Sequence, residues 1–350
     1  MKRVSAAIVL AAVLLCGCAD GSFTSVKPHQ QPSSPVQERE VSAKDQQQLY
    51  DVLDAMVRQG QEEAVVFVSG YDQSLLEMQT RQVCAAIEDD HPIGAYAVDW
   101  ISFRQGKSDG QPVLIVYIHY IHGRAEISRI RTVANMDDVS VWITKSLVDY
   151  DTGLVLQVQE YQDTDLVQMV ESIAQSRPHQ VIEMPQVTAQ TYPNTGDTRV
   201  IELHFTYQNN RNALRSMQEQ VTPIFEEAVS SAEGTREEQY QHLASFLTER
   251  FEEYRYTTSI TPAYSLLMHG VGDSRAFAVV YAAMCHQAGL ECLTVSGTKD
   301  GASHYWNIIC LEEGYRHLDL HDQDLRPKTD REMEDLVWDY SAYPACQEEG

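Results

Sequence analysis

The most informative part of the sequence is "HGVGDSRAFAVVYAAMCHQAGLEC", residues 269–292. A glycine-rich turn runs into an alanine-rich amphipathic segment. This pattern predicts a helix with Ser274 as its N-cap and with Gly289 as its C-terminal stop. A hydroxyl at a helix entrance is either a simple cap or a group that attacks a substrate, and the surrounding sequence has to decide between the two.

Helical and extended patterns follow one another around this stretch. Before it, "TREEQYQHLASFLTERFEEYRY" (235–256) places apolar residues at helical spacing. After it, "LECLTVSG" (290–297), "HYWNIICLEE" (304–313) and "GYRHLDL" (314–320) have the character of strands. Residues 233–350 are therefore expected to form helices packed on an antiparallel sheet.

Four short motifs give this region a specific resemblance. They are "AYSLLMHGVGDSRAFA" (263–278), "GLECLTVSG" (289–297), "HYWN" (304–307) and "YRHLDL" (315–320). In order and spacing they resemble the core of the transglutaminase-like superfamily, which has a papain-like fold. The tail "MEDLVWDYSAYPAC" (333–346) also resembles the end of bacterial secreted members. The resemblance covers about the last third of the chain.

The resemblance implies acyl-transfer chemistry by three residues. Family members hold a cysteine thiolate at the helix N-terminus, a histidine that takes and returns the proton, and an aspartate that orients the histidine. The matching positions here are Ser274, His304 and Asp319. A serine hydroxyl is far less acidic than a thiol, so it needs a base and an oxyanion hole suited to its deprotonation during attack. Asp273 stands where the family has an apolar residue, and its charge would oppose an oxyanion.

The first residues have the pattern of an export signal. "MKRVSAAIVLAAVLLCGC" (1–18) has a basic start and a short apolar run, which is typical of a signal peptide. Its end resembles a bacterial lipobox, which implies that residues 1–17 are removed and that Cys18 carries lipid. Residues 18–43 are rich in Ser, Pro and Gln and read as a flexible tether. The expected location is the extracytoplasmic face of the cell membrane, with the lipid as the only membrane contact.

The middle of the chain contains a weak internal repeat. Tyr71 and Tyr161 correspond at an offset of 90 residues, and Val113 and Val200 correspond at an offset of 87. Each unit reads as strand, helix, strand, turn, strand, helix. We therefore expect tandem α+β modules at 44–148 and 149–232, although a single α+β domain with an accidental repeat is an alternative. The fold class is α+β throughout.

Composition limits the classes of ligand. A formal charge of −25 disfavours nucleic acid and anionic lipid surfaces, and it leaves cationic peptides or wall components as easier partners.

The cysteines and histidines give no sign of a metal site. After Cys16 and Cys18, five cysteines remain, at 84, 285, 292, 310 and 346, without the spacing of a zinc site. A disulfide between Cys292 and Cys310 is an open alternative. His119 and His122 fall on a predicted strand, where they point to opposite faces. No metal and no cofactor are expected.

Two functions fit these observations. The first is a cell-surface lipoprotein whose degenerate, non-catalytic domain binds or scaffolds an extracellular protein, a peptide or a cell-wall component. The second is a serine-variant acyl-transfer enzyme of protease, amidase or transglutaminase type that uses Ser274, His304 and Asp319. The missing cysteine and the adjacent Asp273 favour the first function, since a fold alone does not establish an activity.

Overall fold

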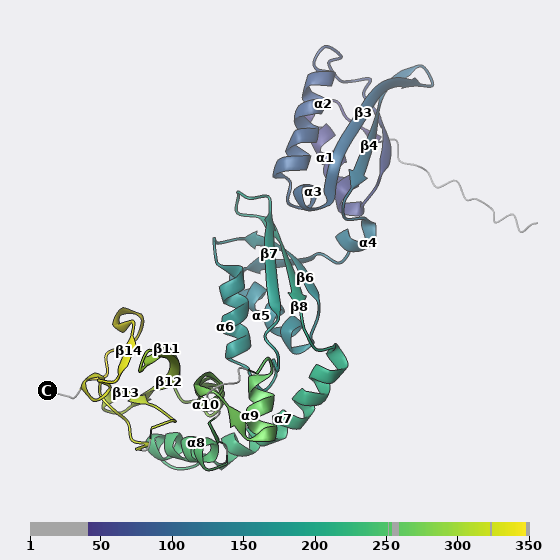
Figure 1. Ribbon diagram of the computed structural model, residues 1–350. Coiled ribbons are helices and arrows are strands. Elements are labelled where there is room, and N and C mark those ends of the chain that lie inside the picture. The colour runs from purple at the N-terminus through teal and green to yellow at the C-terminus, as the bar shows by residue number, and fades with distance from the viewer. Residues whose placement is uncertain (1–40, 251, 254–258, 323, 348–350) are drawn as a thin grey trace, which may run out of the picture. The chain divides into compact units, whose positions relative to one another are not determined.

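The computed structural model describes residues 41–250, 252–253, 259–322 and 324–347 (Figure 1). The expectations for the signal peptide, for Cys18 and for almost all of the tether therefore lie outside the described residues. Within the described part of the chain, no helix is both long enough and apolar enough to cross a membrane.

The first module is a four-stranded sheet with helices on it. Its strand order is β1-β2-β4-β3, with β1 parallel to β2 and the other neighbours antiparallel. The strands are β1 (Val41–Ser42), β2 (Glu63–Phe67), β3 (Val98–Ser108) and β4 (Gln111–Tyr120), and the helices are α1 (Gln46–Gln59), α2 (Leu76–Ala85), η1 (Ala86–Asp90) and α3 (Pro92–Ala97). Alternation along β2 and β4 sends Val66, Val116 and Ile118 into the core beneath these helices.

The second module repeats this topology. Its sheet has the order β5-β6-β8-β7, again with one parallel pair followed by antiparallel pairs. The strands are β5 (Arg131–Asn135), β6 (Gly153–Glu160), β7 (Gln186–Tyr192) and β8 (Arg199–Thr206), with helices α5 (Met136–Val148) and α6 (Leu166–Gln175). The identical strand order supports the duplication that the sequence indicated. Because β5 pairs with β6, residues 131–148 belong to the second sheet, which moves the boundary expected at 148 toward residue 130.

Each repeat is followed by a helix, and the two helices differ greatly in length. After β4 comes α4 (Arg124–Ile127), and after β8 comes α7 (Arg211–Ser231). Arg124 and Arg211 correspond in the repeat, so the two helices begin at equivalent positions. The long helix α7 carries Leu214, Val221 and Phe225 into the hydrophobic core of the C-terminal domain.

The C-terminal domain packs helices on an antiparallel sheet of order β13-β12-β11-β14, as expected. Its remaining helices are α8 (Arg236–Arg250), α9 (Pro262–His269), α10 (Ser274–Gln287), η2 (Asp330–Glu332) and η3 (Tyr340–Ala342). Its strands are β9 (Glu252–Glu253), β10 (Val271–Gly272), β11 (Cys292–Lys299), β12 (Ala302–Leu311), β13 (Gly314–Leu318) and β14 (Leu336–Trp338).

The two faces of this sheet have different partners. On one face, Asn307 donates from Nδ2 to the carbonyl of Ala278, which fixes α10 against β12. On the other face, Trp306 and Ile308 pack with Trp338 and other residues of the C-terminal segment. The site residues of β12 therefore lie between a buried helix and the chain's last described segment.

One local expectation from the sequence is wrong, and one alternative that the sequence left open is not realised. The N-cap of α10 is Asp273, whose Oδ1 accepts a hydrogen bond from the N–H of Ala276, and Ser274 is the first helical residue. An aspartate caps as well as a serine does, so sequence preference alone could not separate the neighbours. The alternative disulfide is also absent, because Cys292 and Cys310 are free thiols and Cys292 lies opposite Ile309.

Candidate functional site

His304 and Asp319 form a buried pair on neighbouring strands. His304 lies on β12, and Asp319 directly follows β13. The strand register pairs Asn307 with Leu318, so His304 and Asp319 meet diagonally, with 2.9 Å between Nε2 and Oδ2. Their residue exposures are only 7% and 2%. The structure thus brings together two of the three positions that the resemblance assigned.

The surroundings of Asp319 favour its charged form. Burial by itself raises the pKa of this carboxyl group. The hydrogen bond and charge of His304, the N–H of His321 at 3.0 Å and the ammonium of Lys299 at 3.4 Å outweigh burial and lower the pKa to about 2. Asp319 is therefore an anion at neutral pH, as the orienting residue of a proton-transferring histidine needs to be.

Ser274 takes up a different interaction. Its Oγ accepts a hydrogen bond of 3.2 Å from the backbone N–H of Tyr305, and the residue is 8% exposed. Among the described residues, no hydrogen bond joins Ser274 to His304. A hydroxyl becomes a nucleophile when a base accepts its proton. The candidate base, His304, directly precedes Tyr305 on β12. Its Nε2 is hydrogen-bonded to Asp319, and within the described part of the chain neither ring nitrogen is hydrogen-bonded to this hydroxyl.

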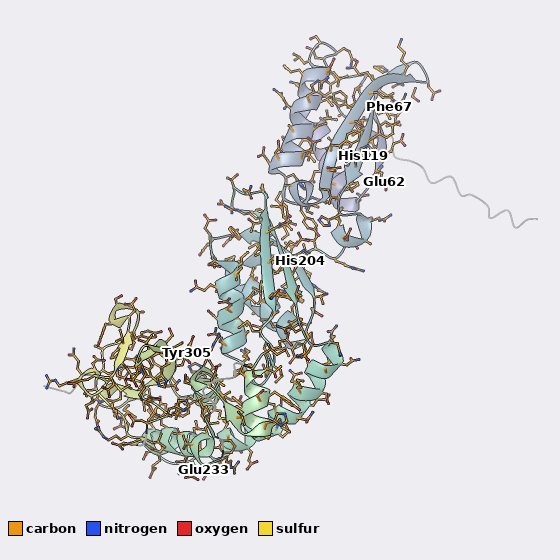
Figure 2. The ribbon with its side chains drawn as sticks, viewed as in Figure 1. Glu62, Phe67, His119, His204, Glu233 and Tyr305 are labelled. Atoms are coloured by element: carbon orange, nitrogen blue, oxygen red, sulfur yellow. The ribbon has the colours of Figure 1, made fainter. Side chains whose placement is uncertain are left out.

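A cation and an aromatic ring flank Ser274. The guanidinium of Arg275 lies 5.8 Å from the centre of the Tyr305 ring, which is a long cation–π contact. Figure 2 labels Tyr305 on the C-terminal domain. Among the described residues, Arg275 forms no ion pair, although the chain carries a large excess of acidic groups. The helix entrance therefore carries an exposed guanidinium that pairs with no carboxylate within the part of the chain that the structure describes.

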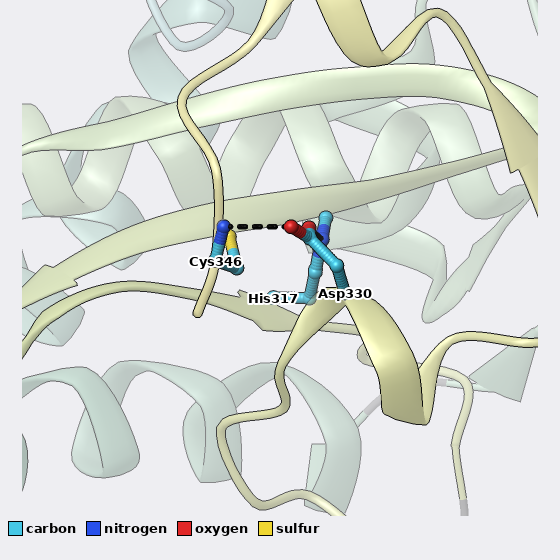
Figure 3. Close-up of side chains that lie close together, drawn as sticks. All are labelled: His317, Asp330 and Cys346. Atoms are coloured by element: carbon cyan, nitrogen blue, oxygen red, sulfur yellow. Dashed lines mark hydrogen bonds and ion pairs between the residues drawn. The ribbon is translucent and has the colours of Figure 1, made fainter. Parts of the chain in front are cut away.

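A second histidine, which the sequence analysis did not single out, fixes the strand that carries His304. His317 is fully buried, accepts at Nδ1 from the indole N–H of Trp306, and contacts Asp330 through Nε2, each at 2.9 Å. Asp330 in turn accepts from the backbone N–H of Cys346 (Figure 3). The Trp306 ring stacks on His304 with 6.0 Å between ring centres. Through Asp330 and His317, the C-terminal segment thus holds the Trp306 ring that stacks on His304.

His317, Asp330 and Cys346 also form a cluster of metal-ligand types, with donor atoms within 4.8 Å of one another. The hydrogen-bond pattern does not fit a metal. Trp306 only donates, so Nδ1 of His317 is unprotonated, and the ring proton must lie on Nε2. A metal would need the lone pair of that same Nε2. Burial lowers the pKa of His317 despite the opposing effect of Asp330, and burial raises the pKa of the Cys346 thiol to about 12. The cluster is a structural network.

The sequence contained one signal for this network. "HYW" and "RHLD" each place two functional side chains two residues apart, and strand alternation puts such pairs on one face. His304 and Trp306 on β12 then lie on the same face as His317 on β13 and Asp319 directly after it. Which partner each one takes depends on the register of the two strands, which the motifs do not encode.

Comparison with known proteins agrees with this architecture. Residues 224–320 match the sequence profile of the Transglutaminase-like superfamily, so the C-terminal part of the chain is a transglutaminase-like domain. No curated protein matches the chain.

Three solved structures show distant similarity. One is a TGase structure, with 7% identity, a TM-score of 0.27, and coverage of 66% of this chain and 67% of that chain. Another is a candidate cysteine protease from Cytophaga hutchinsonii, with 12% identity, a TM-score of 0.28 and coverage of 44% and 65%. The third is a candidate protease from Parabacteroides distasonis, with 9% identity, a TM-score of 0.24 and coverage of 65% and 36%. At these scores the structures carry no argument about activity.

Proposed function

We propose that the protein is a lipid-anchored cell-surface lipoprotein whose transglutaminase-like domain binds a peptide or a cell-wall fragment without turning it over. The anchor rests on the lipobox-like sequence that ends at Cys18. The binding role rests on the helix entrance, where the group at the nucleophile position is engaged by the backbone of Tyr305.

One observation carries the non-catalytic part of the proposal. The Ser274 hydroxyl is almost completely buried and accepts from a backbone N–H, while His304 is held by Asp319. The charged Asp273 lies directly before it, where negative charge would oppose an oxyanion. Among the described residues, this serine has no base that accepts its proton, and the charge of the adjacent Asp273 opposes an oxyanion.

A second function remains specific enough to test. The His304–Asp319 hydrogen bond is buried and 2.9 Å long, and Asp319 is ionised, as an acyl-transfer enzyme requires. A serine-variant enzyme would need a small displacement of Ser274 so that its proton reaches the imidazole. Under this alternative, Ser274 would act as nucleophile, His304 as base and Asp319 as the orienting residue, on an amide bond.

Covalent labelling separates the two functions. The purified protein is treated with a fluorophosphonate, and intact mass is measured for the wild type, for Ser274→Ala and for Ser274→Cys. We expect no adduct on the wild-type serine. For Ser274→Cys we expect rapid alkylation by iodoacetamide at position 274, because a thiol is acidic enough for the helix N-terminus to hold it as thiolate.

The control for the cysteine variant is Ser274→Cys combined with His304→Ala, mapped by peptide mass so that the five described native thiols are scored separately. Slower alkylation in the double variant would show that the histidine still serves this position. A fluorophosphonate adduct on wild-type Ser274 that is absent from Ser274→Ala would overturn the non-catalytic proposal in favour of the enzyme.

A further inference from the structure

A cavity of about 190 Å³ lies beside the start of α10, on residues that no catalytic role uses. Its walls come from α6, from the segment before β7, from the segment before and into α9, and from the first turns of α10. Most of the lining is apolar, and it includes Ala174, Pro178, Val181, Ile182, Met184, Ile260, Pro262, Ala263, Ala276, Val279 and Val280. The second module and the transglutaminase-like domain both contribute to it.

Size and lining indicate an apolar occupant. An apolar cavity of about 150 Å³ can stay dry and can bind benzene. The cavity here is somewhat larger, so it has room for one aromatic ring or one branched aliphatic group. Ile260 is 46% exposed and Val279 is half-buried, so part of the apolar wall faces solvent when no ligand is present.

The charged groups of the lining differ in whether they are already satisfied. Glu183 is 2% exposed and accepts from the backbone N–H groups of Gln208 and Asn209 and from the Asn209 side chain. Asp273 accepts from the N–H of Ala276 as the helix cap. Arg275 is exposed and, among the described residues, has no carboxylate partner. Arg275 is the one cationic side chain among the described residues that line the cavity, and a guanidinium binds carboxylates in charge-assisted pairs.

From this lining we infer that the cavity binds a carboxylate-bearing ligand with one aromatic or branched apolar group, such as the C-terminal residue of a peptide. The apolar group fills the space against Val279 and Ile260, and Arg275 pairs with the carboxylate. This inference deepens the proposed function, because it assumes that the domain binds peptides, and it names the residue class that it recognises. Ser274 takes no part in the contact.

Calorimetry with two matched probes tests the inference on the full chain. The probes are N-acetyl-phenylalanine, which has a free carboxylate, and its amide, which has none. The wild type is expected to bind the acid more tightly than the amide. Arg275→Gln should weaken binding of the acid about tenfold and leave binding of the amide unchanged, since one charge-assisted hydrogen bond is lost. Arg215→Gln, an exposed arginine on α7 away from the cavity, is the control and should change neither.

Filling the cavity provides the second arm. Val279→Phe should weaken the binding of both probes by at least about tenfold, because the added ring occupies the apolar space. Ile260→Trp does the same from a solvent-exposed wall, where a large side chain leaves folding intact. Thermal melts confirm that each variant is folded.

The outcomes separate this inference from the proposed function. Unchanged binding in a folded cavity variant, or wild type that binds neither probe, overturns the cavity assignment and says nothing about fluorophosphonate labelling of Ser274. Loss of binding in Arg275→Gln for the amide as well as the acid would overturn the carboxylate pairing. Labelling of Ser274 would overturn the non-catalytic function while leaving the cavity result intact.

Discussion

Among single residues of the site, His304 and Asp319 form the hydrogen bond that the family requires, whereas no hydrogen bond joins Ser274 to His304 among the described residues. Nε2 of His304 and Oδ2 of Asp319 lie at hydrogen-bond distance, whereas Oγ of Ser274 accepts a hydrogen bond from the backbone N–H of Tyr305. That bond uses an oxygen lone pair of the hydroxyl, and in the part of the chain that the structure describes its proton is not donated to the imidazole of His304. The buried aspartate, in contrast, is stabilised only as long as its partners stay in place.

Asp319 should link folding stability to pH. Its folded-state pKa of about 2 lies below the value of 3.8 for a free aspartate side chain, so its contribution to stability is complete above about pH 4 and is lost as pH falls toward 2. The shift corresponds to about 2 kcal/mol. We expect Asp319→Asn to lower the free energy of unfolding by about that amount near pH 6, measured by urea titration. The difference between variant and wild type should shrink toward zero near pH 2; a constant difference would contradict the assignment.

At the scale of elements, strand β12 is held from both sides. Asn307 joins it to α10, and the Trp306–His317 bond joins it to β13 and, through Asp330, to the C-terminal segment. Gly297 on β11, opposite His304, lets the Trp306 ring and β14 approach closely. The position of His304 is thus a property of the whole sheet and not of its own loop.

Gly297→Ala tests this close approach. A Cβ at this position would lie 2.4 Å from the carbonyl oxygen of Val337 and 2.8 Å from the Trp306 ring. The Val337 backbone and the buried Trp306 ring can shift only at a cost in packing. We therefore expect the free energy of unfolding to fall by about 2–3 kcal/mol. Ser296→Ala, at the exposed neighbouring position, is the matched control and should cost little. Equal stability of the two variants would show that β14 is more loosely packed than described.

The sequence predicted the helices and strands better than it predicted which strands pair with one another. Alternating strands, the helix at 274–287 and the antiparallel character of the C-terminal sheet followed from local patterns. The segment 131–148 was placed in the wrong module, because its strand pairs in parallel with β6 and no turn signal marks such a pairing. For the site, the resemblance to the transglutaminase-like superfamily assigned His304 and Asp319 to one site, and the two side chains lie within hydrogen-bond distance. The Ser274–Tyr305 bond depends on a backbone N–H, which side-chain patterns do not reveal.

At the scale of the whole molecule, the last repeat and the transglutaminase-like domain share a helix. The family match begins at residue 224, inside α7, and not at the boundary of 233 suggested by the sequence. Phe225 and Ala228 of this helix lie in one hydrophobic core with Tyr240, Leu243 and Phe277. Cooperative unfolding should therefore extend across the expected boundary.

A truncation tests this sharing. A fragment of residues 233–350 lacks the apolar residues of α7, each of which would cost about 2–5 kcal/mol if deleted from a core. We expect this fragment to lack a cooperative thermal transition by near-ultraviolet circular dichroism. A fragment of residues 211–350, which keeps α7, should show such a transition. A sharp transition in the shorter fragment at the temperature of the longer one would refute the shared core.

The continuous helix α7 also restricts how this chain can vary in length. An α-helix turns about 100° per residue, so one inserted or deleted residue near its middle would rotate the apolar stripe of Leu214, Val221, Phe225 and Ala228 out of phase with itself. The equivalent helix of the first repeat, α4, has four residues and no such stripe to keep in phase. We therefore expect this chain to tolerate an inserted residue after the first repeat far better than one in the middle of α7.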